Sequence, residues 1–257
     1  MLEKFRGAKH AEIAHLKALE ASEDLPLPYQ GKRPSFSDAI LAGAPIAVIA
    51  EYKRASPSAG DINLGLTPGE AAAMYAAAGA AALSVLTEET YFKGSLDYLD
   101  IMSGAGLPML RKDFILHPLQ VAATAATKAS ALLVIVRMLT DEELAEILRR
   151  TYDAGLEAVI EVFDEPDLAR AEAAGAHIIQ VNSRDLDTLT TDLAVAERLA
   201  KRKRPGRIWI AASGIKTRSD VLRMAALGFD AVLVGTSLMS GTDPGAALAR
   251  LTGRMPS

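Results

Sequence analysis

Ionisable and amide side chains recur in this sequence where short apolar runs end. Glu51 and Lys53 lie two residues apart at the end of the apolar run that begins at Ile46. Alternation along an extended strand puts such residues on one face. Equivalent positions after later apolar runs hold Lys112, Glu161 and Asn182. Ammonium and carboxylate groups at the ends of buried strands are costly unless they are paired or used, so their recurrence there indicates a functional site. A structural ion pair is the alternative for Glu51 and Lys53.

Two later runs end in small residues instead of charged ones. Ser213-Gly214 and Gly235-Thr236 both precede segments with helical patterns. Glycine lets backbone N–H groups approach a ligand closely, and the start of a helix favours an anion. Either glycine alone could belong to an ordinary turn, but the two together predict a phosphate-binding site for a small molecule.

Repeated units position these side chains, each with a short apolar strand, a polar loop and an amphipathic helix. The expected strands span residues 46–52, 82–86, 108–112, 131–136, 157–162, 178–181, 208–212 and 231–234. The expected helices span residues 67–78, 95–103, 118–127, 141–153, 165–174, 191–201, 217–227 and 244–251. Eight such units predict a single (β/α)8 TIM barrel, in which active sites lie at the carboxyl ends of the strands and phosphate at the last two. An open doubly wound sheet is the alternative, but the segment 56–60 is not the glycine-rich dinucleotide loop expected there.

The first 45 residues read as an N-terminal helical extension of the barrel, which would occupy residues 46–257 of one domain. Leu2, Phe5 and Leu16 contribute to a helical apolar stripe, with Lys, Glu and His residues on the opposite side. Prolines in the segment 22–34 predict an extended linker. Ser35 is then expected to cap a short helix over residues 36–42.

Composition excludes several classes of function. The chain has 257 residues, no cysteine and a net charge of −4, which removes thiol chemistry and argues against a nucleic-acid surface. No apolar run reaches the roughly 18 residues of a membrane span, and no signal-peptide pattern opens the chain. The histidines do not form a ligand-spaced cluster, so no metal site is predicted. We therefore expect a cytoplasmic protein without a membrane or nucleic-acid partner, and a monomer by default.

Several short motifs stand in order at the expected strand ends. They are Ile49-Ala-Glu-Tyr-Lys53 with Ser56-Pro57-Ser58, Leu86-Thr-Glu-Glu-Thr-Tyr-Phe-Lys-Gly-Ser95, Leu110-Arg-Lys-Asp-Phe-Ile115, Ile160-Glu161, Val181-Asn-Ser-Arg-Asp-Leu186, Ser213-Gly-Ile215 and Gly235-Thr-Ser-Leu-Met239. In this combination the chain resembles the indole-3-glycerol phosphate synthase family over nearly its whole length. The resemblance implies a carboxy-lyase of tryptophan biosynthesis, which closes the ring of 1-(2-carboxyphenylamino)-1-deoxyribulose 5-phosphate with loss of carbon dioxide and water. It implies no metal or organic cofactor.

The resemblance also implies roles for residues at matching positions. Lys112 matches the general acid at the substrate ketone, and Glu161 matches the carboxylate of the later proton transfer, in which Lys53 is an alternative donor. Lys53 would also neutralise an anionic group of the substrate, and Glu51 would hold the lysines. Asn182 and Arg184 match residues that position the anthranilate portion and the sugar hydroxyls.

Further positions complete the implied site. The phosphate cradle is matched by Ser213, Gly214, Gly235 and Thr236. Candidates for contact with the rest of the substrate are Ser56, Leu86, Phe92, Leu133 and Leu233, although each of the apolar ones could equally be ordinary core. The segment 54–65 is expected to be a mobile cover that excludes water.

One position departs from the family pattern. Where the family has Glu-Ser-Gly-Ile, this chain has Ala212-Ser213-Gly214-Ile215. The resemblance implies that a carboxylate is missing near Lys112, so the alternative function is a catalytically weakened or inactive barrel that still binds a phosphate ligand. Another phosphosugar enzyme on this barrel, phosphoribosylanthranilate isomerase, would be expected to use a cysteine, which this chain lacks.

Overall fold

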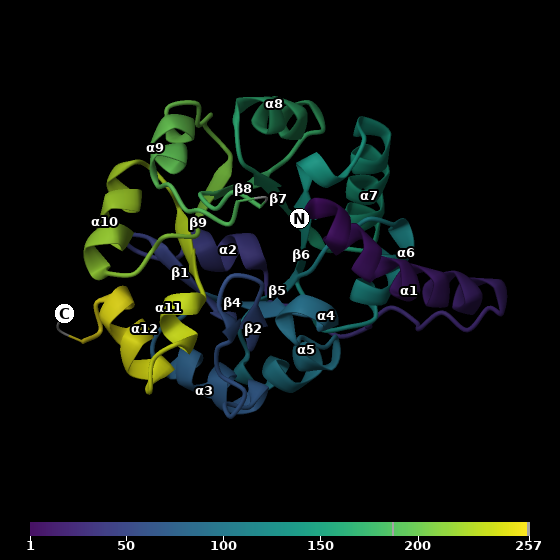
Figure 1. Ribbon diagram of the computed structural model, residues 1–257, viewed down its shortest axis with the longest axis horizontal. Coiled ribbons are helices and arrows are strands. Elements are labelled where there is room, and N and C mark those ends of the chain that lie inside the picture. Colours follow the sequence, from purple (N-terminus) through teal and green to yellow (C-terminus); the bar gives the residue numbers. More distant parts are fainter. Residues whose placement is uncertain (187, 256–257) are drawn as a thin grey trace.

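Eight parallel strands close into a barrel in the computed structural model, which describes residues 1–186 and 188–255 (Figure 1). Around the barrel the strands follow the order β1-β10-β9-β8-β7-β6-β5-β4. They are β1 (Ala47–Tyr52), β4 (Ala82–Leu86), β5 (Met109–Lys112), β6 (Ala131–Ile135), β7 (Glu157–Val162), β8 (Ile178–Asn182), β9 (Ile208–Ala212) and β10 (Ala231–Val234). The predicted (β/α)8 barrel is confirmed, and each strand begins and ends within one residue of its predicted bounds.

A ring of helices surrounds the strands, as Figure 1 shows. The ring contains α3 (Pro68–Ala77), α5 (Asp97–Met102), α6 (Pro118–Ala125), α7 (Asp141–Asp153), α8 (Glu165–Ala173), α9 (Ala194–Ala200), α10 (Arg218–Ala226) and α12 (Pro244–Thr252). Capping boxes fix where four of these helices begin, at Thr67, His117, Thr140 and Thr217. None of the helices in the described part of the chain is long and apolar enough to cross a membrane.

Strand alternation divides the core into two layers. On β1, Val48 and Ala50 belong to the layer between strands and helices, whereas Ala47 and Ile49 belong to the cluster inside the barrel. Inward-facing residues of the other strands fill the barrel in the same way. The polar side chains at the last inward positions therefore gather at the carboxyl end of the barrel.

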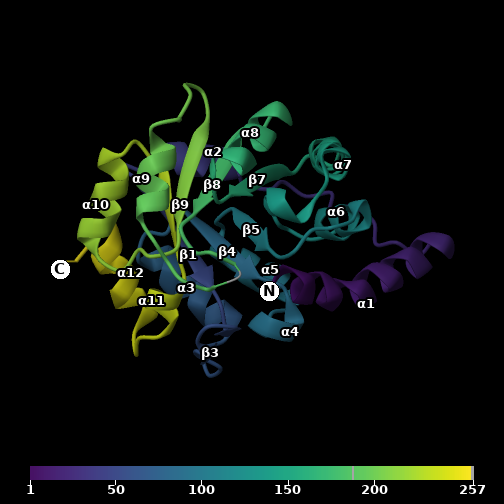
Figure 2. The ribbon, with the colours of Figure 1, turned by 45° about the horizontal axis from the view of Figure 1, so that its top comes forward.

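The N-terminal extension forms two helices that pack on different parts of the barrel. Helix α1 (Leu2–Ala21) lies against α6 and projects from the body of the protein (Figure 2). Helix α2 (Phe36–Leu41) lies at the amino end of the barrel strands, where the backbone N–H of Phe36 donates to Glu157 at the start of β7. One detail of the predicted α1 is wrong: Lys9, expected on its outer side, is only 4 % exposed.

Short elements depart from the predicted pattern because they are too short to show a period. The helices predicted over 95–103 and 191–201 begin two and three residues later, and the segment 54–65 contains a small hairpin of β2 (Ala55–Ser56) and β3 (Gly60–Asp61). The sequence analysis did not predict α4 (Glu89–Phe92), α11 (Thr236–Met239) or the 3₁₀ turns η1 (Ser103–Ala105) and η2 (Val136–Met138). Helices α4 and α11 follow β4 and β10 directly, so both lie at the carboxyl end of the barrel.

Candidate active site

A cavity of about 620 Å³ opens at the carboxyl end of the barrel. Every residue that the sequence analysis assigned to the site lines this cavity: Glu51, Lys53, Ser56, Leu86, Phe92, Lys112, Leu133, Glu161, Asn182, Arg184, Ser213, Gly214, Leu233, Gly235 and Thr236. They come from all eight strands or the loops that follow them. The cavity is large enough for a small phosphorylated molecule with an aromatic ring.

Glu51 is a buried carboxylate that is held in its ionised form. Its Oε1 lies 2.9 Å from Nζ of Lys53, and the Ser84 hydroxyl donates to Oε2 at 3.3 Å. Burial alone would raise the pKa of Glu51, but the ammonium groups of Lys53 and Lys112 and these hydrogen bonds outweigh burial and lower it. Glu51 therefore fixes Lys53 at the wall of the cavity, where the Lys53 side chain remains 13 % exposed.

Lys112 and Glu161 face each other across the cavity floor at a longer distance. Nζ of Lys112 lies 3.9 Å from Oε2 of Glu161, which is too far for a hydrogen bond. The Lys112 side chain is 18 % exposed, whereas that of Glu161 is 1 % exposed and also accepts a hydrogen bond from Gln180. The ammonium group of Lys112 can therefore donate to a substrate atom without first breaking a short ion pair.

On the opposite side of the cavity, two glycines bring the backbone close to neighbouring side chains. Gly214 has a φ of +84°, and a Cβ there would lie 2.8 Å from Leu193, so only glycine fits without strain. A Cβ on Gly235 would lie 2.2 Å from the Glu51 carboxylate. Thr236 begins α11 immediately afterwards. Glycine backbone and the start of a helix allow N–H groups to approach an anion closely.

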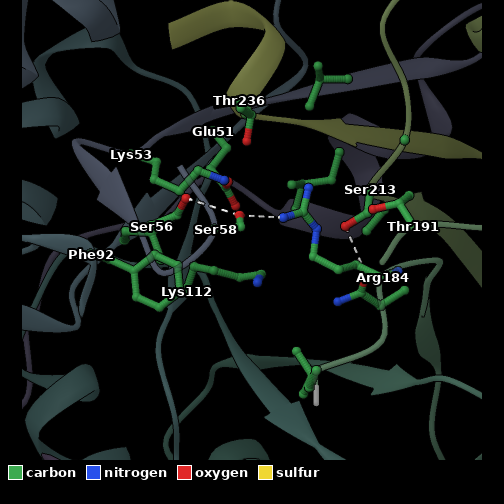
Figure 3. Close-up of a pocket in the computed structure, with 18 of the residues that line it drawn as sticks. Glu51, Lys53, Ser56, Ser58, Phe92, Lys112, Arg184, Thr191, Ser213 and Thr236 are labelled. Carbon is green, nitrogen blue, oxygen red and sulfur yellow. Dashed lines mark hydrogen bonds and ion pairs between the residues drawn. The ribbon is translucent and has the colours of Figure 1, made fainter. Parts of the chain in front are cut away.

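Arg184 reaches from the loop after β8 across the cavity, as Figure 3 shows. Its Nη1 donates to the Ser58 hydroxyl in the segment that follows β1, at 2.7 Å. Asn182 accepts from the Ser213 hydroxyl and from the Arg184 backbone N–H, at 2.8 and 3.0 Å. The carboxamide oxygen of Asn182 thus accepts hydrogen bonds from within the protein, and its amide nitrogen can donate to a ligand.

An aromatic wall faces the cavity from the side of α1 and β5. Phe5 stacks on Phe114 with ring centroids 4.4 Å apart, and it contacts Tyr91 and Phe92. Both Phe5 and Phe114 line the cavity, and the sequence analysis assigned neither to the site. Phe114 lies two residues after Lys112, so alternation could have identified it. No local signal in the sequence could have placed Phe5 here.

A second charge cluster lies between α1 and β5, and we call it the outer cluster: Lys9, Glu12, Arg111 and Asp113. Its Asp113 follows β5 and also borders the cavity. Lys9 lies 2.5 Å from Glu12 and 2.6 Å from Asp113, and Arg111 lies 2.8 Å from Glu12 and 2.9 Å from Asp113. Burial alone would raise the pKa of Asp113, but the positive charges of Arg111 and Lys9 lower it overall. The sequence analysis missed this cluster, which ties α1 to the strand that carries Lys112.

The resemblance implies a glutamate where this chain has Ala212, whose methyl side chain carries no charge. Ala212 faces into the barrel, 3 % exposed, as the β9 neighbour of Asn182. Glu88 also lines the cavity, but its carboxylate accepts three backbone N–H groups of α4. In residues 1–186 and 188–255 no group of three or more His, Cys, Asp or Glu side chains could hold a metal ion.

Comparison with known proteins identifies related sequences along nearly the whole chain. The family model for indole-3-glycerol phosphate synthase matches residues 2–251. The indole-3-glycerol phosphate synthase of Desulfosudis oleivorans is 43% identical over 241 residues, which cover 93% of this chain and 89% of that protein. That of Opitutus terrae is 45% identical over 230 residues, covering 87% of this chain and 86% of the relative.

Similarity to solved structures concerns the fold alone. The 3-hexulose-6-phosphate synthase of Salmonella typhimurium superposes with a TM-score of 0.65 at 16% sequence identity, covering 81% of this chain and 97% of that one. A structural match at such low sequence identity supports the barrel fold and says nothing about the reaction. The family follows from the sequence matches: this chain belongs to the indole-3-glycerol phosphate synthase family.

Proposed function

We propose that this protein converts 1-(2-carboxyphenylamino)-1-deoxyribulose 5-phosphate into indole-3-glycerol phosphate, carbon dioxide and water. The observation that carries the proposal is that Lys112 lies 3.9 Å from Glu161, without a hydrogen bond between them. Both face a cavity with an aromatic wall on one side and a glycine-rich wall on the other. The aromatic wall suits the anthranilate ring, and the glycine-rich wall suits the phosphate.

Lys112 is the general acid of ring closure. The aryl carbon that bears the carboxylate attacks the ketone carbon, and Lys112 protonates the ketone oxygen as it becomes a hydroxyl. The bond to the carboxylate then breaks, carbon dioxide leaves, and its electron pair restores the aromatic ring. An acid at a developing oxyanion contributes about 10²- to 10⁴-fold to the rate.

Glu161 and Lys53 act in the dehydration that follows. Lys53 protonates the departing hydroxyl, which leaves as water, and Glu161 accepts the proton lost from the adjacent carbon. Glu161 then returns this proton to Lys112 across their 3.9 Å separation. Lys53 recovers its proton from solvent. The reaction therefore takes up one proton per turnover, as expected when a carboxylate loses carbon dioxide.

The remaining residues hold the substrate. The backbone at Ser213, Gly214, Gly235 and Thr236 binds the phosphate, and Arg184 exchanges its bond to Ser58 for the substrate as the segment 54–65 closes over the cavity. Asn182 and Ser56 bind the polar middle of the substrate, and Leu86, Phe92, Leu133 and Leu233 contact the ring together with Phe5. Glu51 keeps Lys53 in place.

We also propose that the chain works as a single-domain, cytoplasmic monomer. The large exposed hydrophobic side chains of the described residues include Leu27, Leu41, Leu64, Ile101 and Leu222, and they lie on different elements. Such scattered residues are normal for a monomer. Light scattering after gel filtration tests this, and a dimer mass at micromolar concentration would contradict it.

Turnover of the substrate tests the proposed reaction. We expect the fluorescence of the indole product to rise with one carbon dioxide released per product. Substrate that binds without turnover, as measured by calorimetry, would instead identify a phosphate-ligand-binding barrel that has lost the chemistry. Absence of both binding and turnover would refute the synthase assignment altogether.

A further inference from the structure

Gln180 is a fully buried polar side chain inside the barrel, one layer below the cavity. It lies two residues before Asn182 on β8, so both face inward. Asn182 lines the cavity, whereas Gln180 is 0 % exposed. On the neighbouring strand its register partner is Glu161, and Nε2 of Gln180 donates a hydrogen bond to Oε2 of that carboxylate.

The other half of the Gln180 amide makes no hydrogen bond. Among the described residues, no group donates to Oε1, although this atom is buried. A buried acceptor without a donor costs free energy, so an apolar side chain of equal size would serve packing better. Turning the amide over would set Oε1 against the carboxylate of Glu161, which is repulsive. The bond to Glu161 is therefore the interaction that accounts for an amide at this position.

Glu161 depends on that bond for its orientation. Among the described residues its ion-pair partner is Lys112, whose Nζ lies 3.9 Å from Oε2, beyond hydrogen-bond distance. On the far side of β8, the β9 residue at the level of the cavity is Ala212, which has no polar group to offer. The Glu161 carboxylate would otherwise be free to turn away from Lys112.

We propose that Gln180 is a positioning residue for the reaction: it holds the Glu161 carboxylate toward Lys112 from below. It thereby supports the acid–base pair from β8, in a chain whose β9 contributes no side chain that could do so. The inference rests on the proposed function of the cavity, and it adds a residue outside the cavity lining to the catalytic machinery.

Gln180→Met tests the proposal, because methionine has a similar length and no N–H donor. We expect kcat to fall about ten- to hundredfold, the effect of one hydrogen bond to a charged group. KM should stay within about twofold because no cavity-lining residue changes. The melting temperature should fall only slightly, because removal of the unpaired oxygen offsets part of the cost of leaving the buried Glu161 carboxylate without its donor. Gln30→Met, at an exposed glutamine, is the matched control and should change none of these values.

Gln180→Glu provides a second readout that a structural role would not produce. A carboxyl group at this position donates to Glu161 only in its protonated form, and two adjacent carboxylates share a proton. The kcat of this variant should therefore approach that of the wild type at the acid end of the pH profile and fall as the pH rises. The wild type and Gln180→Met should not show this dependence.

Three outcomes would overturn the proposal. The first is an unchanged kcat in Gln180→Met. The second is a fall in kcat of that variant accompanied by a comparable rise in KM and a large fall in melting temperature. The third is a ratio of Gln180→Glu to wild-type activity that does not change with pH. The wild-type assay is read first, and its failure would refute the proposed function instead. A crystal structure of Gln180→Met decides without any turnover: a Glu161 carboxylate that still faces Lys112 overturns the inference, and one that has turned away supports it.

Discussion

Strand β5 separates two charge clusters that differ in how fully their charges are paired. In the outer cluster, Lys9 and Arg111 each contact two carboxylates within 2.9 Å, and the side chain of Asp113 is 1 % exposed. In the cavity cluster (Glu51, Lys53, Lys112 and Glu161), Lys53 has one short contact, at 2.9 Å to Glu51, and Lys112 approaches Glu161 no closer than 3.9 Å. Arg111 faces outward and Lys112 inward because side chains alternate along the strand, whereas Asp113 follows the strand and also borders the cavity.

The difference separates two uses of buried charge. A cluster in which each charge has short contacts to opposite charges has no donor or acceptor left for a ligand, and breaking it leaves an uncompensated charge. A cluster whose ammonium groups each have one short contact or none keeps donors available and costs less to rearrange during a reaction. We infer that the outer cluster holds the strand in place, whereas the cavity cluster carries the chemistry.

Lys112→Met should produce the largest effect on turnover. We expect kcat to fall by about 10²- to 10⁴-fold, because the general acid is lost, while the melting temperature hardly changes. Lys112→Arg is the sharper control, since arginine keeps the positive charge but cannot give up a proton near neutral pH. Stopped and continuous assays of product fluorescence measure both variants. If Lys112→Arg retains most of the activity, the residue acts through its charge and is not the acid.

Asp113→Asn should have the opposite profile, with a large loss of stability and a small loss of turnover. The variant keeps the shape of the side chain but leaves Lys9 and Arg111 with a single carboxylate, which should lower the free energy of unfolding by about 3 kcal/mol or more at pH 7. The kcat of the folded variant should change by less than about threefold, under 1 kcal/mol in the barrier.

The same substitution carries a pH signature. The folded-state pKa of Asp113 is lowered, so its stabilisation is present above the unfolded value of about 3.9 and is lost as the pH falls through the folded value. Denaturant titrations should therefore show wild type and variant converging below about pH 4. Asp153→Asn, which removes an exposed carboxylate 2.9 Å from Arg149, is the control and should hardly change the melting temperature. Lost activity with unchanged stability would assign the outer cluster to the chemistry.

Local patterns in the sequence predicted one of these clusters and missed the other. Lys112 and Glu161 end apolar strands, so strand periodicity and the known geometry of the barrel were enough to place them together. Lys9 and Phe5 reach β5 from a helix about a hundred residues earlier, and a helical pattern does not show which side of a helix another element will cover. Gln180 could have been found, because it lies two residues before Asn182 and must face the same way.

Ala212→Glu should have the smallest effect, and it tests whether the cavity cluster is complete. Lys112 already faces Glu161, and Glu161 is already held by Gln180, so we expect an added carboxylate beside Asn182 to change kcat by less than about tenfold in either direction. Ala212→Gln has the same size without the charge, so comparing the two variants separates crowding of the cavity from electrostatics. A much larger rise in kcat for Ala212→Glu alone would mean that the loose pairing around Lys112 reflects a missing partner. A similar small fall in both variants would mean that the site works with two carboxylates, and that its open contacts are the arrangement the reaction uses.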